Sequence, residues 1–344
     1  MKRHFSVRAI TVGLLFVLIV IGGLWYFFKI DRHFLKFQPE ANKEYVWGIT
    51  FSKSYAEDLG LDWRQAYVAM LDDLKVRFIR LPVYWSDIEA TENSFDYADY
   101  DWMVSEGQKR DVKFILAVGR RLPRWPECHA PDWTVGLPEQ TLRDRELAMV
   151  RQVVQRYQSE RSVISWQAEN EYFVDWFGIC PKGDQEYLAS VIKTIRQQDS
   201  ARPVLLTDSG EFSTWGQVSQ LSDSIGTTMY RVAWNPQLGY TYSPWPDWFY
   251  RWKASFRHLD LNKTIIAELQ AEPWPTAGRS MGDLTDEEIQ RSFPIEQLFT
   301  NAEVARRTGF SATYFWGAEW WYARLLQGDD SYWNAAKQIM QSAR

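Results

Sequence analysis

Histidine is scarce in this chain of 344 residues, which contains only four. His4 and His33 flank an apolar segment near the N-terminus, so a folded domain could use only His129 and His258. Zinc sites and Ser-His-Asp triads both draw on histidine. We therefore disfavour both kinds of site, and we expect neither a metal nor another cofactor.

A basic surface is also missing. The formal net charge is −5, and after residue 36 acidic side chains outnumber basic ones by 43 to 33. Nucleic-acid-binding domains carry a basic patch or stripe, so this balance argues against a nucleic-acid partner. The sequence also lacks low-complexity linkers and internal repeats, which favours one folded domain after the N-terminal segment.

Cysteine occurs only twice, as Cys128 and Cys180, and each lies next to or near a proline in a segment expected to be a loop. Two buried free thiols are one interpretation. We prefer a single disulfide bond, which requires an oxidising compartment.

The N-terminal segment bears on that compartment. Residues Ala9 to Phe28 form an uncharged stretch of 20 residues, about the length that spans a bilayer core. Three basic residues precede the stretch, and Trp25 and Tyr26 near its end are typical interfacial aromatics. A cleaved signal peptide is the alternative, but no Ala-x-Ala site follows. We expect residues 1–36 to form a cytoplasmic tail, a single transmembrane anchor and a juxtamembrane segment. Residues 37–344 would then be a folded domain on the extracytoplasmic side of the cytoplasmic membrane.

Short apolar runs alternate with amphipathic helical patterns through the rest of the chain. Eight β-to-α alternations predict an α/β fold, a closed (β/α)8 TIM barrel. An open doubly wound sheet is the alternative, but no G-x-G-x-x-G loop follows the first strand. The expected strands are 45–51, 76–81, 113–118, a fourth beginning at 163, 203–207, 224–229, 264–269 and 312–316.

Polar and aromatic residues stand where these strands end, and active sites of such barrels lie at the strand C-termini. Ile266 and Glu268 alternate onto one face of their strand, which would bring Glu268 to the barrel mouth. Glu169 and Glu171 point the same way in a regular strand, so periodicity cannot choose between them. Any one of these residues could instead make a structural salt bridge or anchor a loop. The strand-end residues are Arg80, Asn170, Glu171, Tyr230, Glu268 and Trp316.

Two carboxyl groups facing each other are what glycosidic bond cleavage requires. Tryptophan supports a sugar-binding site, because an indole face stacks on the apolar face of a sugar ring. The chain has 19 Trp, and many fall in expected loops. Each alone is more often a packing residue. We select Trp316, Trp274 and Trp85 as the candidates for sugar stacking.

The chain resembles the retaining glycoside hydrolases of the large (β/α)8 clan, and most closely the cellulase-like members of glycoside hydrolase family 5. The resemblance rests on Ile79-Arg80-Leu81-Pro82-Val83-Tyr84-Trp85, Glu169-Asn170-Glu171-Tyr172, Ile266-Ala267-Glu268-Leu269 and Tyr314-Phe315-Trp316-Gly317. The string Gln-x-Glu-Asn-Glu-Tyr is also similar to the β-galactosidase families of that clan. Family 5 enzymes commonly have histidine where this chain has Gly119-Arg120-Arg121 and Met229-Tyr230-Arg231.

This resemblance implies a role for each matching residue. Glu171 would be the acid/base and Glu268 the nucleophile, with Arg80 and Tyr230 holding Glu268. Asn170 would bind the sugar 2-hydroxyl, and Trp316 would lie under the reacting sugar. A bridge between Cys128 and Cys180 would pin two loops beside Glu171.

We therefore expect a retaining glycoside hydrolase that cleaves O-glycosidic bonds of a β-linked oligo- or polysaccharide by double displacement. Its partners would be the glycan substrate and the membrane, through residues 9–28, with a monomeric catalytic domain. A carbohydrate-binding pseudoenzyme, for example a scaffold in polysaccharide export, needs the aromatics but not both carboxylates. A transglycosylase shares every residue named and differs in how well it excludes water.

Overall fold

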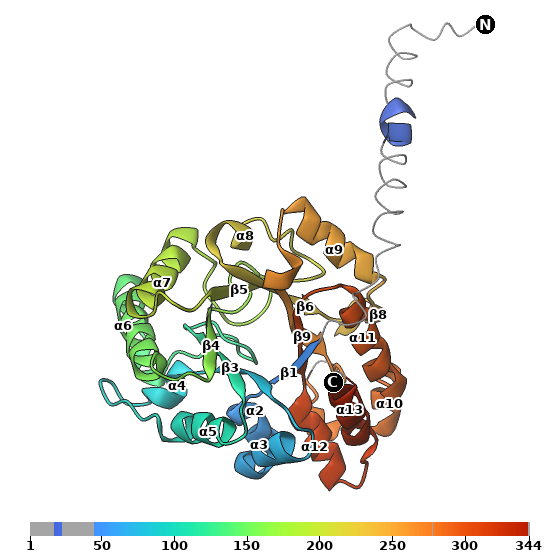
Figure 1. The fold of residues 1–344 in the computed structure, drawn as a ribbon, viewed down its shortest axis with the longest axis horizontal. Helices are drawn as coiled ribbons and strands as arrows, with labels where there is room; N and C mark the ends of the chain where they lie inside the picture. Colours follow the sequence, from blue (N-terminus) through green and yellow to red (C-terminus); the bar gives the residue numbers. More distant parts are fainter. Residues whose placement is uncertain (1–16, 23–44, 277, 343–344) are drawn as a thin grey trace, which may run out of the picture.

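The computed structural model describes residues 17–22, 45–276 and 278–342. Within them, eight parallel strands close into a barrel in the order β1-β10-β9-β6-β5-β4-β3-β2, and the helices form a ring outside it (Figure 1). Closure confirms the predicted TIM barrel and excludes the open doubly wound sheet. The barrel strands are β1 (Val46–Thr50), β2 (Phe78–Pro82), β3 (Lys113–Val118), β4 (Val163–Ala168), β5 (Val204–Asp208), β6 (Ser224–Met229), β9 (Thr264–Gln270) and β10 (Ala312–Trp316).

Helix starts follow capping residues that the sequence makes visible. Asp62 and Asp184 each accept two backbone N–H groups at the starts of α3 and α7, as preferred N-cap residues do. The helices are α2 (Lys53–Asp58), α3 (Trp63–Asp72), α4 (Trp85–Ile88), α5 (Ala98–Gln108), α6 (Glu139–Tyr157), α7 (Gln185–Gln198), α8 (Val218–Leu221), α9 (Asp247–Phe256), α10 (Asp286–Ser292), α11 (Ile295–Arg307), α12 (Ala318–Leu326) and α13 (Ser331–Gln341).

Between β6 and α9 the chain inserts an antiparallel hairpin, β7 (Val232–Asn235) and β8 (Gly239–Tyr242). This hairpin was not predicted from the sequence. Its four-residue strands are short, and β8 has no fully buried residue, so the hairpin lacks the apolar run by which a core strand is recognised.

Where the barrel strands are regular, alternate residues face the interior or the helices. A small interior cluster contains Ile115, Leu205, Ile265, Ala267, Ala312 and Tyr314, whereas the large cluster fills the layer between strands and helices. Gly48 is needed here because a Cβ on it would lie 2.7 Å from the Tyr314 ring. The interior is therefore filled, and chemistry can occur only at its ends.

The predicted transmembrane segment, residues 9–28, lies mostly outside the described residues, of which 17–22 are helical. Across 17–22, 45–276 and 278–342, no helix combines the length and apolar character needed to cross a membrane. The predicted boundary between residues 36 and 37 also lies outside the described residues.

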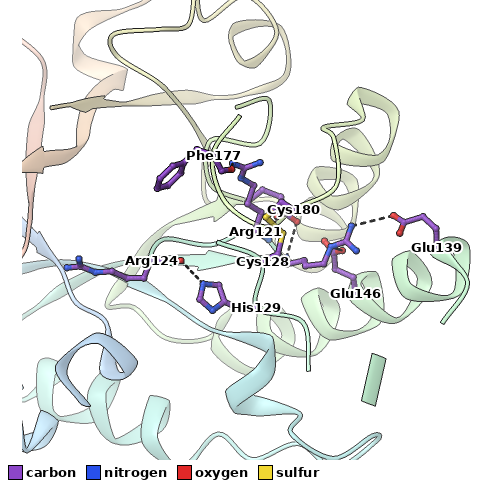
Figure 2. The surroundings of a disulfide bond; sticks show 10 residues. Arg121, Arg124, Cys128, His129, Glu139, Glu146, Phe177 and Cys180 are labelled. Carbon is purple, nitrogen blue, oxygen red and sulfur yellow. Dashed lines mark hydrogen bonds and ion pairs between the residues drawn. A yellow bond between two sulfur atoms is a disulfide. The ribbon is translucent and has the colours of Figure 1, made fainter. Parts of the chain in front are cut away.

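Cys128 and Cys180 form a disulfide, as predicted, with their Cα atoms 5.4 Å apart. It joins the loop after β3 to the loop after β4, and Arg121 beside it donates to the Phe177 carbonyl at 2.8 Å (Figure 2). The two loops at this side of the barrel mouth are thus tied both covalently and by a hydrogen bond.

Reduction of this disulfide should lower the free energy of unfolding by about 2 to 4 kcal/mol, because in the unfolded state it opens the loop between two cysteines that are 52 positions apart. Urea unfolding with and without dithiothreitol measures the change. A Cys128→Ser/Cys180→Ser variant, insensitive to dithiothreitol, is the control. An unchanged midpoint on reduction would contradict a stabilising bridge.

Candidate active site

Arg80 on β2 is the centre of a buried polar cluster at the C-terminal ends of the strands. Its side chain is fully buried and donates to the side chains of three residues from β4, the β4 loop and β9. Nε donates to Gln167 Oε1 at 2.6 Å, Nη1 to Glu268 Oε1 at 2.9 Å and Nη2 to Asn170 Oδ1 at 2.6 Å. One guanidinium thereby sets the positions of side chains from β4, the β4 loop and β9.

Glu268 reaches this cluster because β9 contains an irregularity. Thr227 and Thr228 of β6 are consecutive, yet they pair with Ile266 and Glu268 of β9. The register with β10 also shifts between Thr313 and Phe315. The extra residue in β9 is a β-bulge, which re-aims the side chains that follow it.

The bulge corrects the alternation argument made from the sequence. Ile266 belongs to the layer facing the helices, whereas Ile265 and Ala267 face the barrel interior. Strict alternation would therefore turn Glu268 outward with Ile266. The shared face predicted for Ile266 and Glu268 is wrong, although Glu268 does lie at the barrel mouth.

Tyr230 binds the second oxygen of Glu268. Its hydroxyl donates to Glu268 Oε2 at 2.9 Å, so each oxygen of this carboxylate has one donor. Burial, followed by the charge of Glu268, raises the pKa of Tyr230 well above its usual value, which keeps the phenol protonated as a donor. Trp274 packs edge-to-face on the Tyr230 ring at 5.5 Å and is partly exposed.

The turn after β4 separates the two glutamates that periodicity could not distinguish. Glu169 and Glu171 have φ of 57° and 42°, left-handed conformations that are uncommon for glutamate. The Glu169 carboxylate is buried and accepts the backbone N–H groups of Arg120 and Arg121 at 3.2 and 2.6 Å. Glu171 remains partly exposed, and its N–H donates to Thr207 Oγ1 at 2.9 Å.

Asn170 is held between these two residues. Its Oδ1 accepts from Arg80, from Thr207 Oγ1 at 2.9 Å and from Gln167 Nε2 at 3.2 Å. With the oxygen fully engaged, the amide nitrogen is the group left to meet other partners. Strain stored in such a turn is typical of functional sites.

Glu171 and Glu268 have different electrostatic surroundings. Burial raises the pKa of Glu171 well above its ordinary value, and the charges of Glu268 and Glu127 raise it further. Glu268 instead has a guanidinium and a phenol donating to its oxygens. One carboxyl of the pair is therefore biased towards its protonated form, while the other is held as an acceptor.

Glu127 is a third carboxyl in this site, and the sequence analysis did not select it. It lies in the loop after β3, is 4% exposed, and its pKa is raised to about 8 by burial and then by the charge of Glu268. Only its position beside Cys128 could have drawn attention to it, because a loop residue carries no periodicity.

Arg124, from the same loop, covers Trp316. Its guanidinium lies 3.9 Å from the Trp316 ring centroid and 3.5 Å from that of Tyr55. It also pairs with Glu272 at 2.6 Å and Glu319 at 3.3 Å. The ring face of Trp316 that Arg124 covers is not available for stacking on a sugar.

Trp85 is a core residue. Its indole is fully buried, donates to Glu89 Oε2 at 2.7 Å and packs edge-to-face on Trp133. The predicted role of Trp85 in sugar stacking is incompatible with this burial. Of the three selected tryptophans, Trp274 is thus the one beside Tyr230 with exposed surface.

The remaining histidine of interest, His129, contacts the Arg124 carbonyl at 3.0 Å (Figure 2). Its ring also packs on Tyr84. Across the described ranges, no three His, Cys, Asp or Glu side chains are grouped to hold a metal ion. The chemistry available from the described residues is acid/base and nucleophilic, with carboxyl groups.

Comparison with known proteins agrees with this arrangement. The family described as cellulase, glycosyl hydrolase family 5, matches residues 47–273, which confirms the resemblance seen in the sequence. Among curated proteins, none matches this chain.

Solved structures with similar folds have low sequence identity. A β-galactosidase from the Antarctic haloarchaeon Halorubrum lacusprofundi superposes with a TM-score of 0.58 at 15% identity, covering 87% of this chain and 58% of that one. A β-galactosidase from Marinomonas ef1 gives 0.57 at 15% identity, covering 86% and 59%. Xylanase 10B from Thermotoga petrophila, in complex with xylobiose, gives 0.55 at 12% identity, covering 91% and 96%. The chain thus spans less than two thirds of either β-galactosidase, and these likenesses show the fold alone.

Stability should fall as the pH rises from about 5 to 8. Burial raises the pKa of Glu127 to about 8 and those of Glu211 and Glu319 to about 7, so the folded state keeps protons that the unfolded state releases above its value of 4.5. Between its unfolded-state and folded-state pKa values, each such group lowers the free energy of unfolding by up to about 1.4 kcal/mol per pH unit. Urea unfolding across this range measures the slope.

A Glu127→Gln variant provides the matched control, because glutamine has no proton to lose. Its stability should decline less steeply than that of the native chain between pH 5 and 8. A free energy of unfolding that rises steadily from pH 5 to 8 would contradict the buried, protonated carboxyls.

Proposed function

Since the chain is a glycosidase that belongs to the cellulase family, glycosyl hydrolase family 5, we propose that it hydrolyses a β-linked oligo- or polysaccharide by double displacement. Glu268 is the nucleophile and Glu171 the acid/base in this proposal. The observation that carries the proposal is that the two carboxyls have different surroundings. The Glu268 carboxylate accepts hydrogen bonds from Arg80 and Tyr230, whereas the pKa of Glu171 is raised.

In the first step, the protonated Glu171 gives its proton to the glycosidic oxygen as the bond to the anomeric carbon breaks. A Glu268 oxygen forms a bond to that carbon, and the leaving group departs as an alcohol. In the second step, Glu171, now a carboxylate, takes a proton from water, whose oxygen displaces Glu268 from the anomeric carbon. Arg80 and Tyr230 hold the Glu268 carboxylate in place during attack.

Sugar binding in this proposal uses groups already placed around the two glutamates. The Asn170 amide nitrogen donates to a sugar hydroxyl, because the amide oxygen has three donors of its own. Trp274 supplies apolar surface beside Tyr230. The similar structures include a β-galactosidase and a xylanase bound to xylobiose, so β-galactosides and xylan fragments are the first sugars to test.

We also propose that the enzyme works outside the cytoplasmic membrane, held by residues 9–28. The uncharged 20-residue stretch and its interfacial aromatics support an anchor. The Cys128–Cys180 disulfide supports an oxidising compartment.

One observation favours a second candidate, a glycan-binding protein without turnover. Arg124 lies over Trp316, the side chain that would lie under the reacting sugar. A substrate that needs that ring face would have to displace Arg124 from Glu272 and Glu319.

Turnover of defined glycans tests the proposal. The full chain should release reducing sugar from at least one of a panel of β-glucans, mannans, xylans and galactosides. Glu268→Gln and Glu171→Gln should each lower kcat by at least about 100-fold, because each removes a reacting group.

Glu303→Gln, on the outer helix α11, is the matched control and should leave kcat unchanged. Glycan binding without turnover by the native chain would favour the second candidate. Full activity in Glu268→Gln would exclude Glu268 as the nucleophile.

A further inference from the structure

We propose that Glu127 is a specificity-determining residue, whose carboxyl group pairs with a hydroxyl of the sugar bound between Glu171 and Glu268. The proposal rests on the proposed function, since it assigns a ligand contact within the same site. It adds a contact from the loop after β3, which the family motifs on β4 and β9 do not include.

The backbone holds Glu127 in one position. Its N–H donates to the Arg124 carbonyl and its carbonyl accepts from Leu122 N, both at 2.8 Å. Cys128 follows directly and is bonded to Cys180. The side chain packs so closely on Gly178 that a Cβ there would lie 2.7 Å from the Glu127 Cβ and Cγ. The carboxyl is therefore placed before any ligand arrives.

One carboxyl oxygen of Glu127 lacks a partner. Within the part of the chain that the structure describes, Oε2 is buried and makes no hydrogen bond. Buried polar groups are rarely left in this state, and the exceptions concentrate at functional sites. A ligand hydroxyl that reached this oxygen would satisfy it.

The neighbours of Glu127 place it at the reacting centre. Its side chain is hydrogen-bonded by Asn170, whose amide nitrogen is free for this contact because Arg80, Gln167 and Thr207 occupy Oδ1. The charge of Glu268 acts directly on Glu127, and Glu127 acts on Glu171. Glu127 and Asn170 thus lie together beside the two reacting carboxyls.

The charge state favours a hydroxyl over a cation. Burial and then the charge of Glu268 raise the pKa of Glu127 to about 8, while Arg121 and Arg80 oppose the rise. At pH 6 the group is a carboxylic acid, which both donates and accepts, as a sugar hydroxyl does. An ammonium group on an amino sugar would instead require a carboxylate.

Binding to a catalytically disabled protein tests this contact without relying on turnover. The full chain carrying Glu268→Gln is titrated calorimetrically at pH 6 with cellotetraose, mannotetraose, xylotetraose and β-1,4-galactotetraose. Glu127→Leu and Glu127→Gln are then added to it separately, with Glu303→Leu as a matched change on an outer helix. Thermal unfolding verifies that each protein is folded.

For the tetrasaccharide that binds, Glu127→Leu should weaken affinity at least tenfold, because leucine keeps the shape but cannot hydrogen-bond. Glu127→Gln should restore affinity to within about threefold of the Glu268→Gln parent, since an amide also donates and accepts. Glu303→Leu should leave it unchanged.

Equal affinity in the Glu127→Leu protein would overturn the proposal while leaving the proposed function intact. A loss in Glu127→Gln as large as in Glu127→Leu would also overturn it, because the contact would then need a carboxylate. If the folded Glu268→Gln parent bound none of the four sugars and the native chain cleaved none of the panel glycans, the proposed function itself would fail.

Discussion

The site depends on one buried guanidinium. Arg80 is fully buried at the strand ends and donates to Gln167, Asn170 and Glu268, which come from three different segments. A buried charge is costly unless it is paired and hydrogen-bonded, so the three acceptors hold Arg80 as firmly as Arg80 holds them. This mutual dependence gives a carboxylate at the barrel mouth a defined orientation.

Two departures from regular strand geometry bring the reacting groups to Arg80. A bulge in β9 turns Glu268 inward, and left-handed residues after β4 send Glu169 behind the site while Glu171 faces its mouth. The disulfide then ties the β4 loop to the loop that carries Arg124 and Glu127. The regular barrel brings the strand ends together, and these irregularities determine which side chains meet at those ends.

The sequence could predict most of the barrel, because its strands are apolar runs and its main helices have amphipathic patterns and capping residues. It also indicated Arg80, Asn170, Glu171, Tyr230 and Glu268, since strand ends converge in this fold. It could not predict the bulge. Glu268 was therefore placed at the barrel mouth correctly, but from a regular alternation that β9 does not have.

Site residues in loops could not be predicted from the sequence, for a different reason. The positions of Glu127 and Arg124 depend on tertiary contacts of an irregular loop, and no periodicity reports those contacts. The prediction that Trp85 stacks on a sugar was wrong because an expected loop position does not reveal burial. Trp85 lies wholly in the core. The sequence shows how many tryptophans the chain has, but it does not show that Arg124 covers Trp316.

The most direct test of the account is to trap the glycosyl-enzyme. A 2-deoxy-2-fluoro β-glycoside with a dinitrophenyl leaving group, built on the sugar the enzyme cleaves, should inactivate the native chain. Peptide mass spectrometry should then find the added fluorosugar on Glu268. Labelling of Glu171 instead of Glu268, or turnover with no covalent adduct, would contradict double displacement at the carboxylate held by Arg80.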